Sequence, residues 1–142
     1  MRVQRLISGD EAVLAAALSA TGHDLLSDEG LRAHLEDPML TCIVSLVEDQ
    51  VVGFLYGFIL RRFSKTTFFI YSVDVVETYR RKGIGRAMLD ALSEEARSKG
   101  WDEMFVLTNS SNEPAKALYL AAGGVRPNSD DVMFDFYPLV GA

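Results

Sequence analysis

The sequence predicts a mixed α/β domain (α+β) built on a mostly antiparallel sheet. Three strand-like stretches rich in β-branched and aromatic residues follow one another in the first part of the chain, which favours antiparallel pairing. A turn with two glycines comes next, followed by helix, strand, helix and strand patterns. Consecutive strands followed by a strand-to-helix alternation indicate a mixed sheet flanked by helices.

The chain has the length and composition of one domain with its own core. Its 142 residues match the usual size of a single domain, and 49% of them are hydrophobic, as in ordinary globular proteins. No repeat, low-complexity tract or linker interrupts the sequence, so we expect residues 1–142 to form a single domain. The one cysteine, Cys42, lies in an apolar stretch and is interpreted as a core residue rather than a nucleophile.

Charge and hydropathy narrow the classes of partner. The net charge of −6 disfavours nucleic acid, because phosphate binding requires a basic face. An acidic chain suits a cationic partner such as a polyamine, an amino sugar or a lysine-rich peptide. The amino terminus lacks the apolar run of a signal peptide, and no apolar segment reaches the roughly 18 residues that a membrane span needs. These features predict a cytoplasmic protein without a membrane partner.

The first part of the chain is predicted to hold a short strand, two helices and a hairpin. Each helix begins at a capping residue, and the hairpin strands are rich in β-branched and aromatic residues. The expected elements are a strand at 3–7, a helix from Asp10 to about Ser19, a helix from Ser27 that ends before Pro38, and strands at 41–48 and 51–60 joined by the turn Glu48-Asp49-Gln50.

The second part is predicted to alternate strands and helices. The third strand, at 67–76, is expected to carry two sets of side chains on opposite faces. One face carries Phe69, Tyr71, Val73 and Val75, and the other carries Ile70, Ser72 and Asp74. The remaining elements are a helix at 84–99 stopped by Gly100, a strand at 104–108, a helix at 114–122 and a last strand at 132–136.

A basic turn with two glycines joins the third strand to the next helix. The first amides of a helix have no partner within the helix, and the helix dipole adds roughly half a positive charge there. Glycines let an anion approach these amides closely, and basic side chains raise the local positive potential. The sequence therefore predicts a diphosphate site. Its residues are Arg80, Arg81, Lys82, Gly83, Ile84, Gly85 and Arg86.

A solvated loop is the alternative interpretation of this turn. Basic residues near a helix start are unfavourable for the dipole, which argues against chance placement. The spacing of Gly83 and Gly85 differs from both the Walker loop and the dinucleotide fingerprint. Neither of those two nucleotide sites is therefore predicted.

Two motifs resemble the signatures of the GCN5-related N-acetyltransferase (GNAT) superfamily. The first, Arg80-x-x-Gly83-x-Gly85, looks like the motif that binds the pyrophosphate of acetyl-CoA. The second is Asn112-x-x-Ala115-x-x-Leu118-Tyr119-x-x-x-Gly123, at the usual separation from the first. The resemblance implies an N-acetyltransferase with a splayed central sheet, in which acetyl-CoA lies where two neighbouring parallel strands separate. It implies acetyl-CoA as the acetyl donor and no metal.

Within the superfamily, the chain is most similar to the type I aminoglycoside 3-N-acetyltransferases. This likeness implies a small cationic acceptor such as an aminoglycoside. That pattern carries acids where this chain has Ser64, Phe68 and Ser72, which weakens the case for a polycationic acceptor. The points of similarity are Val51-Val52-Gly53, Arg62-Phe63, Ile70-Tyr71, Arg80-Arg81, Pro114-Ala115-x-Ala117-Leu118-Tyr119 and Val132-Met133.

The resemblance also implies roles for individual residues in acetyl transfer. Backbone groups of Val73 and Val75 are expected to bind the pantetheine arm and to polarise the thioester carbonyl. Tyr119 is the expected general acid for the departing thiolate, with a core tyrosine as the alternative. Asn112 is expected either to hydrogen-bond the pantetheine arm or to be a plain N-cap.

The general base is less well defined by the sequence. An alkylammonium, whose unperturbed pKa is about 10, must lose a proton before it attacks. Asp74 is the carboxylate within the third strand and is the candidate base. His23 and His34 are isolated in sequence, and no metal-ligand spacing is present. Four further acids are candidates for attracting a cationic substrate or acting through water: Glu113, Asp130, Asp131 and Asp135.

Three functions stay open at this point. The first is an acetyl-CoA-dependent N-acetyltransferase acting on a primary amine of a small cationic substrate, aminoglycosides included. The second is acetylation of a polyamine, a protein lysine or a protein N-terminus, of which the protein substrates need an open groove. The third is a non-catalytic acetyl-CoA-binding module, against which an intact Tyr119 argues. The superfamily often dimerises, and the apolar residues of 134–140 suit a homodimer interface.

Overall fold

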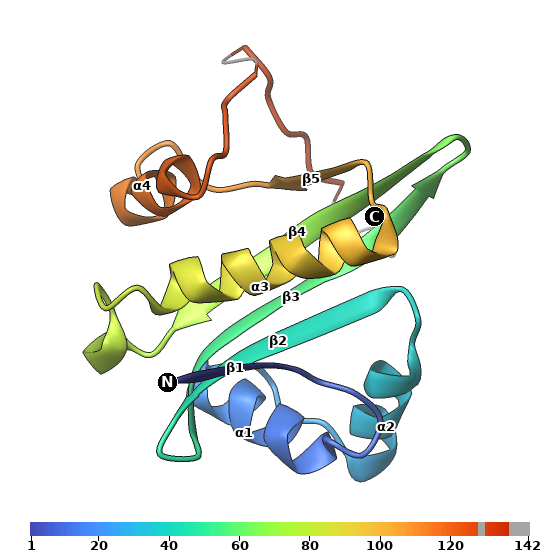
Figure 1. Ribbon diagram of the computed structural model, residues 1–142, viewed down its shortest axis with the longest axis vertical. Coiled ribbons are helices and arrows are strands. Elements are labelled where there is room, and N and C mark those ends of the chain that lie inside the picture. The colour runs from blue at the N-terminus through green and yellow to red at the C-terminus, as the bar shows by residue number, and fades with distance from the viewer. Residues whose placement is uncertain (128–129, 137–142) are drawn as a thin grey trace.

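The computed structural model describes residues 1–127 and 130–136 (Figure 1). No helix in these residues is long and apolar enough to cross a membrane. The elements in this part of the chain are β1 (Arg2–Arg5), α1 (Glu11–Ala20), α2 (Asp28–Glu36), β2 (Leu40–Val47), β3 (Gln50–Arg62), β4 (Lys65–Val75), the 3₁₀ turn η1 (Glu77–Tyr79), α3 (Ile84–Lys99), β5 (Glu103–Val106) and α4 (Glu113–Ala121).

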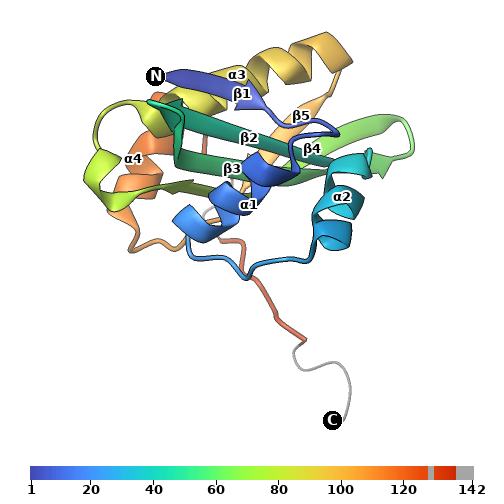
Figure 2. The same ribbon diagram turned by 90° about the horizontal axis from the view of Figure 1, so that it is seen from below.

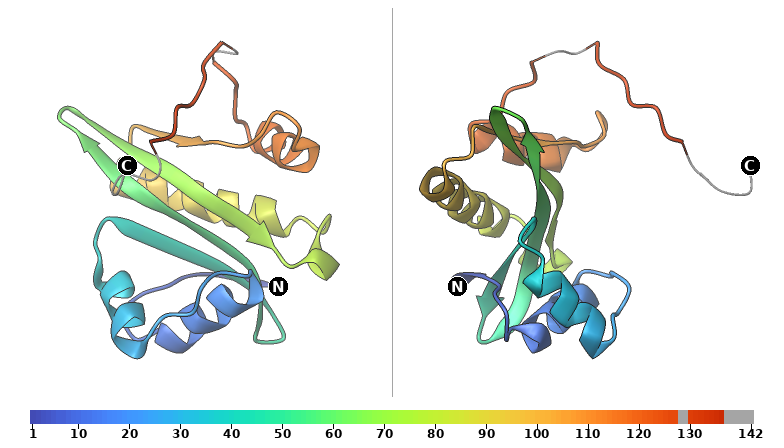
Figure 3. Two further views of the ribbon diagram at one scale, coloured as in Figure 1. Left: turned by 180° about the vertical axis from the view of Figure 1, so that it is seen from behind. Right: turned by 90° about the vertical axis from the view of Figure 1, so that its right-hand side faces the viewer.

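The strands form one five-stranded sheet in the order β1-β2-β3-β4-β5. The first four strands pair antiparallel, whereas β4 and β5 are parallel. Helix α3 lies on one face of the sheet, and α1 and α2 lie on the other (Figure 3, right). Figure 2, seen from below, shows α3 above the sheet and α1 and α2 beneath it. This arrangement confirms the predicted mixed α/β fold with a mostly antiparallel sheet flanked by helices.

Each face of the sheet buries its own apolar core. Successive side chains of a strand point to opposite faces, so neighbours such as Ile43 and Val44 on β2 serve different cores. The core beneath α3 includes Ile43, Val52, Leu55, Phe68, Ile70, Ile84, Met88, Leu89 and Leu92. The core beneath α1 and α2 includes Leu6, Leu14, Ala17, Leu31, Cys42, Val44, Leu46 and Phe54.

Local signals place the turns and caps largely as the sequence predicts. Glu48 and Asp49 both have positive φ, 51° and 62°, which matches the twist of a two-residue hairpin turn. The Ser27 side chain caps α2, as expected. Asp10 precedes α1 but does not cap it, because its carboxylate accepts a hydrogen bond from the backbone N–H of Ile7 at 2.8 Å.

A bulge in β4 changes which of its side chains share a face. Tyr56 of β3 pairs with Ser72, whereas the next residue, Gly57, pairs with Ile70. Tyr71 is therefore an extra residue in β4, and an extra residue reverses the alternation beyond it. The predicted common face of Phe69, Tyr71, Val73 and Val75 is wrong for this reason.

Beyond the bulge, β4 presents different residues to its two sides. Val73 and Val75 pack with Ile70 in the core beneath α3. Tyr71 and Asp74 lie on the opposite face, where Tyr71 stacks on Tyr56 with ring centroids 5.6 Å apart. The bulge thus places the Asp74 carboxylate and the Tyr71 phenol on the same face of the sheet, the face that α1 and α2 partly cover.

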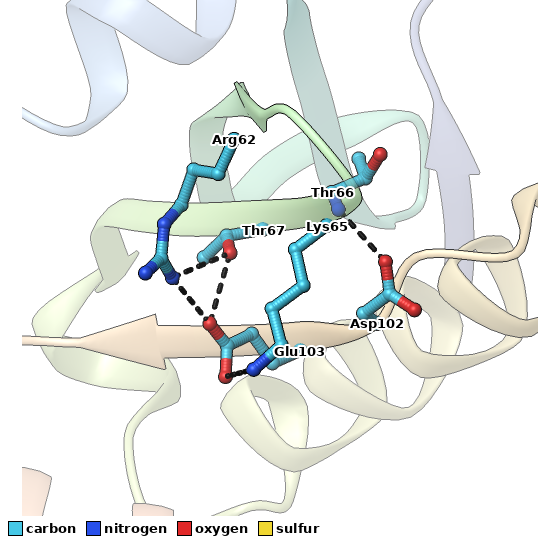
Figure 4. A network of polar contacts seen from close by, with 6 residues as sticks. All are labelled: Arg62, Lys65, Thr66, Thr67, Asp102 and Glu103. Atoms are coloured by element: carbon cyan, nitrogen blue, oxygen red, sulfur yellow. Dashed lines mark hydrogen bonds and ion pairs between the residues drawn. The ribbon is translucent and has the colours of Figure 1, made fainter.

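Strand β5 pairs with only the first part of β4. Residues 67–70 pair with residues 103–106, and the two strands then diverge (Figure 1). A polar network fixes the paired end, where Glu103 Oε1 accepts hydrogen bonds from Arg62 Nη1 at 2.7 Å and Thr67 Oγ1 at 3.0 Å (Figure 4). The strands are therefore held together at one end and separate toward α4, which is the splayed sheet that the resemblance implies.

The strand predicted at 132–136 is wrong. These residues are described and carry no regular secondary structure. A strand needs a hydrogen-bonded neighbour, and no described residue pairs with the outer edge of β5. Val132, Phe134 and Phe136 are accordingly exposed, at 75%, 79% and 78%. An alternating apolar pattern alone does not make a strand.

Candidate functional site

The start of α3 is an open helix terminus. Gly83 is its N-cap residue, in the left-handed conformation with φ of 80°, and provides no side-chain cap. A Cβ atom built on Gly83 would meet nothing within 4 Å, so no other part of the protein crowds this position. The first helical hydrogen bond runs from Ala87 N to Gly83 O, which leaves the three preceding amides without helical partners. These amides suit an anion such as a phosphate.

Gly85 has a different role from Gly83. It is buried, and a Cβ atom at this position would lie 3.0 Å from Leu118 Cδ2 on α4. The absence of a side chain therefore allows α3 and α4 to pack closely. The prediction that both glycines clear the amides for an anion fits the open surroundings of Gly83, whereas the close contact at Gly85 is with the protein itself.

The basic residues of the turn divide into two groups. Arg80 is exposed and donates from Nε to the carbonyl oxygen of Val75 at 3.0 Å, and Lys82 lies 5.4 Å from the ring centre of Tyr79. Arg86 instead joins α3 to the end of α4, because its Nη1 donates to Ala121 O at 2.6 Å. Arg81 is also exposed, and Arg86 is engaged by Ala121 O and by Asp90 Oδ1 at 3.1 Å, so residues 80–82 are the basic side chains left for an anion at the helix start.

Asp74 lies near the end of β4, beside a small cavity. Its Oδ2 accepts a hydrogen bond of 2.7 Å from Ser72 Oγ, and its side chain is 41% exposed. The cavity has a volume of about 150 Å³. It is lined by Ala20, Thr21, Asp74, Val75, Val76, Glu77 and Arg80. The candidate base and the basic turn therefore border the same cavity.

Tyr119 lies on α4, half-buried against the core beneath α3. Its pKa is raised from the usual value of 10.0, first by burial and then by the negative charge of Asp74. The phenol therefore keeps its proton at neutral pH. The effect of Asp74 on this pKa indicates that the candidate acid and the candidate base are close enough to interact.

His23 is a site residue that the sequence analysis missed. It follows α1, and its Nε2 lies 3.9 Å from Asp74 Oδ2. Its Nδ1 is 2.8 Å from the hydroxyl of Thr21. His23 and Asp74 are distant in sequence, and no local pattern links a residue after the first helix to a strand in the middle of the chain. Only the packing of α1 on the sheet brings them together.

An aromatic strip runs across the sheet next to Asp74. Two of its rings, Tyr71 and Phe105, are 59% and 41% exposed. Phe69 stacks on Phe105 at 4.7 Å, so the strip continues from β4 to β5. Aromatic faces attract cations and pack against apolar rings. The members of the strip are Tyr56, Phe58, Phe69, Tyr71 and Phe105.

The other predicted substrate acids are exposed and lie on α4 or in the segment that follows it. Glu113 pairs with Lys116 at 3.1 Å on the first turn of α4. Asp130, Asp131 and Asp135 are exposed in the irregular segment after α4. Their role toward a substrate stays a prediction.

Asn112 and Cys42 both have structural roles. The sequence analysis considered an N-cap for Asn112 and a core residue for Cys42. Asn112 Oδ1 accepts a hydrogen bond of 3.1 Å from Ala115 N, so Asn112 is the N-cap of α4. Its predicted contact with the pantetheine arm stays a prediction. Cys42 is buried, and burial raises the pKa of its thiol to about 12, although Arg5 acts to lower it. Cys42 is thus a core residue, as predicted.

Ser64, Phe68 and Ser72 stand where the type I aminoglycoside acetyltransferases are expected to carry acids. In this structure the three residues do not form one site. Ser64 lies in the turn between β3 and β4. Phe68 is fully buried and stacks on Trp101 at 4.5 Å. Only Ser72 borders Asp74. Residues 1–127 and 130–136 contain no cluster of three or more potential metal ligands.

An open helix start beside a strand that diverges from its parallel neighbour defines a coenzyme-binding protein of the acyltransferase class. The sequence profile of the Acetyltransferase (GNAT) family matches residues 12–123. The chain belongs to this family, whose acetyltransferases use acetyl-CoA.

Curated relatives are N-acetyltransferases of several kinds. The chain is 32% identical over 95 residues to an N-alpha-acetyltransferase of Saccharolobus solfataricus, covering 61% of this chain and 57% of the relative. It is 32% identical over 79 residues to the L-2,4-diaminobutyric acid acetyltransferase of Shouchella clausii, covering 56% of this chain and 44% of the relative. The chain thus spans about half the length of the curated relatives it matches.

Solved structures with the same fold include aminoglycoside acetyltransferases. The enzyme HMB0005 from an uncultured soil metagenomic sample superposes with a TM-score of 0.81 and 26% identity, covering 95% of this chain and 96% of that chain. The aminoglycoside N-acetyltransferase AAC(6')-Iy in complex with CoA superposes with a TM-score of 0.75 and 15% identity, covering 95% of this chain and 98% of that chain. The second likeness shows the fold alone.

Proposed function

We infer that the protein transfers an acetyl group from acetyl-CoA to a primary amine of a small cationic substrate, with an aminoglycoside as the leading acceptor. The observation that carries this proposal is the joint placement of Asp74 and the open start of α3. The carboxylate and Arg80 of the basic turn border one cavity, so an amine bound at Asp74 would lie next to a coenzyme phosphate bound at the turn.

The coenzyme is proposed to lie along the diverging part of β4. The amides after Gly83, with Arg80, Arg81 and Lys82, are suited to the pyrophosphate. Residues 71–75 of β4 continue beyond the segment that pairs with β5. The backbone of Val73 and Val75 can therefore hydrogen-bond a pantetheine arm in the place of a neighbouring strand.

Tyr119 and Asp74 are proposed to act on different reactants, Tyr119 on the leaving thiolate and Asp74 on the acceptor amine. Tyr119, kept protonated by burial and by Asp74, donates its proton to the departing thiolate sulfur. Asp74 is partly exposed and attracts the ammonium group of the acceptor. An acid and a carboxylate that influence each other electrostatically suit a reaction in which an acceptor amine and a thioester must meet.

Two observations favour an aminoglycoside acceptor over other amines. One of the solved structures with the same fold, an aminoglycoside acetyltransferase, is 26% identical and covers 95% of this chain. The aromatic strip next to Asp74 offers exposed rings on which amino sugar rings can pack and to which their ammonium groups are attracted.

Other acceptors stay in competition, because the relatives act on different amines. The N-alpha-acetyltransferase relative favours a protein N-terminus, and the diaminobutyric acid relative favours a small diamino acid. A polyamine or a protein lysine would suit the same acidic site. A non-catalytic acetyl-CoA-binding module would keep the turn at Gly83 and need no acceptor.

Thiol release from acetyl-CoA across a panel of amines tests the proposal. The panel contains kanamycin, gentamicin, spermine and a lysine peptide with a free N-terminus. We expect turnover, with the highest kcat/KM for an aminoglycoside. A preference for the peptide would move the assignment to protein acetylation. Tight acetyl-CoA binding without turnover of any amine would identify a non-catalytic module.

A further inference from the structure

We propose that His23 and Asp74 together bind the acceptor ammonium and that Nε2 of His23 takes its proton before acetyl transfer. This inference rests on the proposed N-acetyltransferase function. It assigns the general base to a residue that the sequence does not single out. The geometry of the two side chains and of Thr21 carries the argument.

Thr21 fixes the tautomer of His23. The Thr21 hydroxyl donates its single hydrogen to the carbonyl oxygen of Ala17 at 2.7 Å. The contact of 2.8 Å between Thr21 Oγ1 and His23 Nδ1 must then be donated by Nδ1–H. A neutral His23 therefore carries its hydrogen on Nδ1 and a lone pair on Nε2. That lone pair belongs to the nitrogen nearest Asp74.

The two facing atoms are both acceptors. With His23 neutral, neither Nε2 nor the ionised Asp74 Oδ2 carries a hydrogen, and they are 3.9 Å apart. A donor placed between them satisfies both. An ammonium nitrogen at about 2.9 Å from each atom would subtend an angle of about 85°, which two hydrogens of one tetrahedral nitrogen can span with modest bending.

The ring of His23 is held in this position by its neighbours. Phe54 and Tyr56 contact it edge-on, each with a centroid distance of 5.8 Å. The titratable groups that face the ring from the sheet are Asp74 on β4 and Tyr56 on β3. The neighbouring residue in the chain, Asp24, is exposed. An imidazole held in place with a lone pair on Nε2 can accept a proton from a donor that binds beside it.

Two residues move protons in the proposed reaction, His23 at the acceptor amine and Tyr119 at the departing sulfur. One N–H bond of the ammonium breaks as the Nε2–H bond forms, which yields a neutral amine and an imidazolium paired with Asp74. The amine nitrogen then bonds to the acetyl carbon while the carbon–sulfur bond breaks. Tyr119 gives its proton to the sulfur and regains one from the acylated nitrogen. His23 finally releases its proton to solvent.

The activity test compares the two histidines. His34 on α2 is exposed, so His34→Gln is a matched control that removes an imidazole outside the site. We expect His23→Gln to lower kcat/KM roughly 10²–10⁴-fold, the range of a positioned general base. The acidic limb of the pH profile should disappear in His23→Gln and persist in His34→Gln. An unchanged acidic limb in His23→Gln would overturn the inference.

An acceptor of low basicity separates catalysis from structure. An aminooxy analogue of the accepted amine is already neutral at assay pH and needs no base. The defect of His23→Gln should therefore shrink strongly with this acceptor. An equal defect for both acceptors would mean that His23 only supports the fold of the site.

The tautomer can be measured without any turnover. Long-range ¹H–¹⁵N correlation spectra distinguish Nδ1–H from Nε2–H, and His34→Gln assigns the two histidine spin systems. We expect the Nδ1–H tautomer for neutral His23. An Nε2–H tautomer, or an imidazolium that persists far above neutral pH, would overturn the inference. Absence of turnover in the wild-type protein would instead refute the proposed function.

Discussion

Gly57 of β3 lies directly against the carbonyl group of Phe69 on β4, at the point where β4 bulges. A Cβ atom on Gly57 would overlap the Phe69 carbonyl oxygen and would lie 2.7 Å from Cε1 of Phe68. The bulge therefore requires a residue without a side chain on the opposite strand. Because the bulge turns Asp74 toward His23, the site depends on this one close approach.

Replacing Gly57 by alanine is expected to destabilise the protein by about 3 kcal/mol, the upper range for overpacking a core. The obstruction is backbone and a buried ring, neither of which can move aside. Gly53→Ala is the comparison, because its Cβ would meet side-chain atoms only, Met88 Cε at 2.9 Å and Ile84 Cγ2 at 3.0 Å, and should cost less than an overlap with backbone. Urea unfolding of both variants measures the difference, and equal costs would contradict the role assigned to Gly57.

Signals confined to a few neighbouring residues predicted much of the fold. Gly100 ends α3 in the left-handed conformation, with φ of 70°. Gly83 opens the same helix, as the basic turn indicated. Both features depend on the ease with which glycine adopts a positive φ, so they can be predicted from the sequence alone.

Features that depend on distant partners were not predictable in the same way. Tyr71 is an extra residue because of the register in which β4 pairs with β3. The prediction of which β4 side chains share a face was wrong for this reason. The contact of Gly85 with Leu118 depends on where α4 packs. The approach of His23 to Asp74 depends on the packing of α1 against the sheet. Each is set by tertiary structure rather than by a local pattern.

Gly83→Asp is expected to abolish measurable acetyl-CoA binding. The position has φ of 80°, which aspartate and asparagine tolerate better than most residues, so the turn should still form. A carboxylate there would lie in front of the open amides and repel the pyrophosphate. Gly83→Asn is the control of equal size without the charge, and calorimetric titration with acetyl-CoA compares the two. Equal losses would show bulk to be the cause, and undiminished binding would place the coenzyme elsewhere.

Asp74→Asn is expected to change the titration of Tyr119. The pKa of Tyr119 is raised by burial and then by the charge of Asp74, and only the second cause disappears in the variant. The pKa should therefore fall toward, but stay above, the usual value of 10.0. Alkaline difference absorbance of phenolate, with Tyr119→Phe in each background as the reference, measures the shift. An unchanged pKa would mean that the two groups do not interact.

The same substitution should also weaken the acceptor site. Loss of the carboxylate removes the charge that attracts an ammonium group, so KM for the accepted amine should rise. Acetyl-CoA binding should stay close to that of the wild-type protein, because the basic turn is unaltered. A parallel loss of coenzyme affinity would indicate that Asp74 supports the turn instead.

Tyr119→Phe is expected to lower kcat by roughly 10²–10⁴-fold, as for other positioned acids. The substitution leaves the ring that packs beneath α3, so folding and acetyl-CoA affinity should change little. Since the raised pKa keeps Tyr119 protonated at neutral pH, the alkaline limb of the wild-type pH profile should begin only at strongly alkaline pH. Tyr56→Phe is the comparison, because Tyr56 lies on the other face, where it should affect KM more than kcat. A Tyr119→Phe variant with wild-type kcat would mean that another group, or water, protonates the departing sulfur.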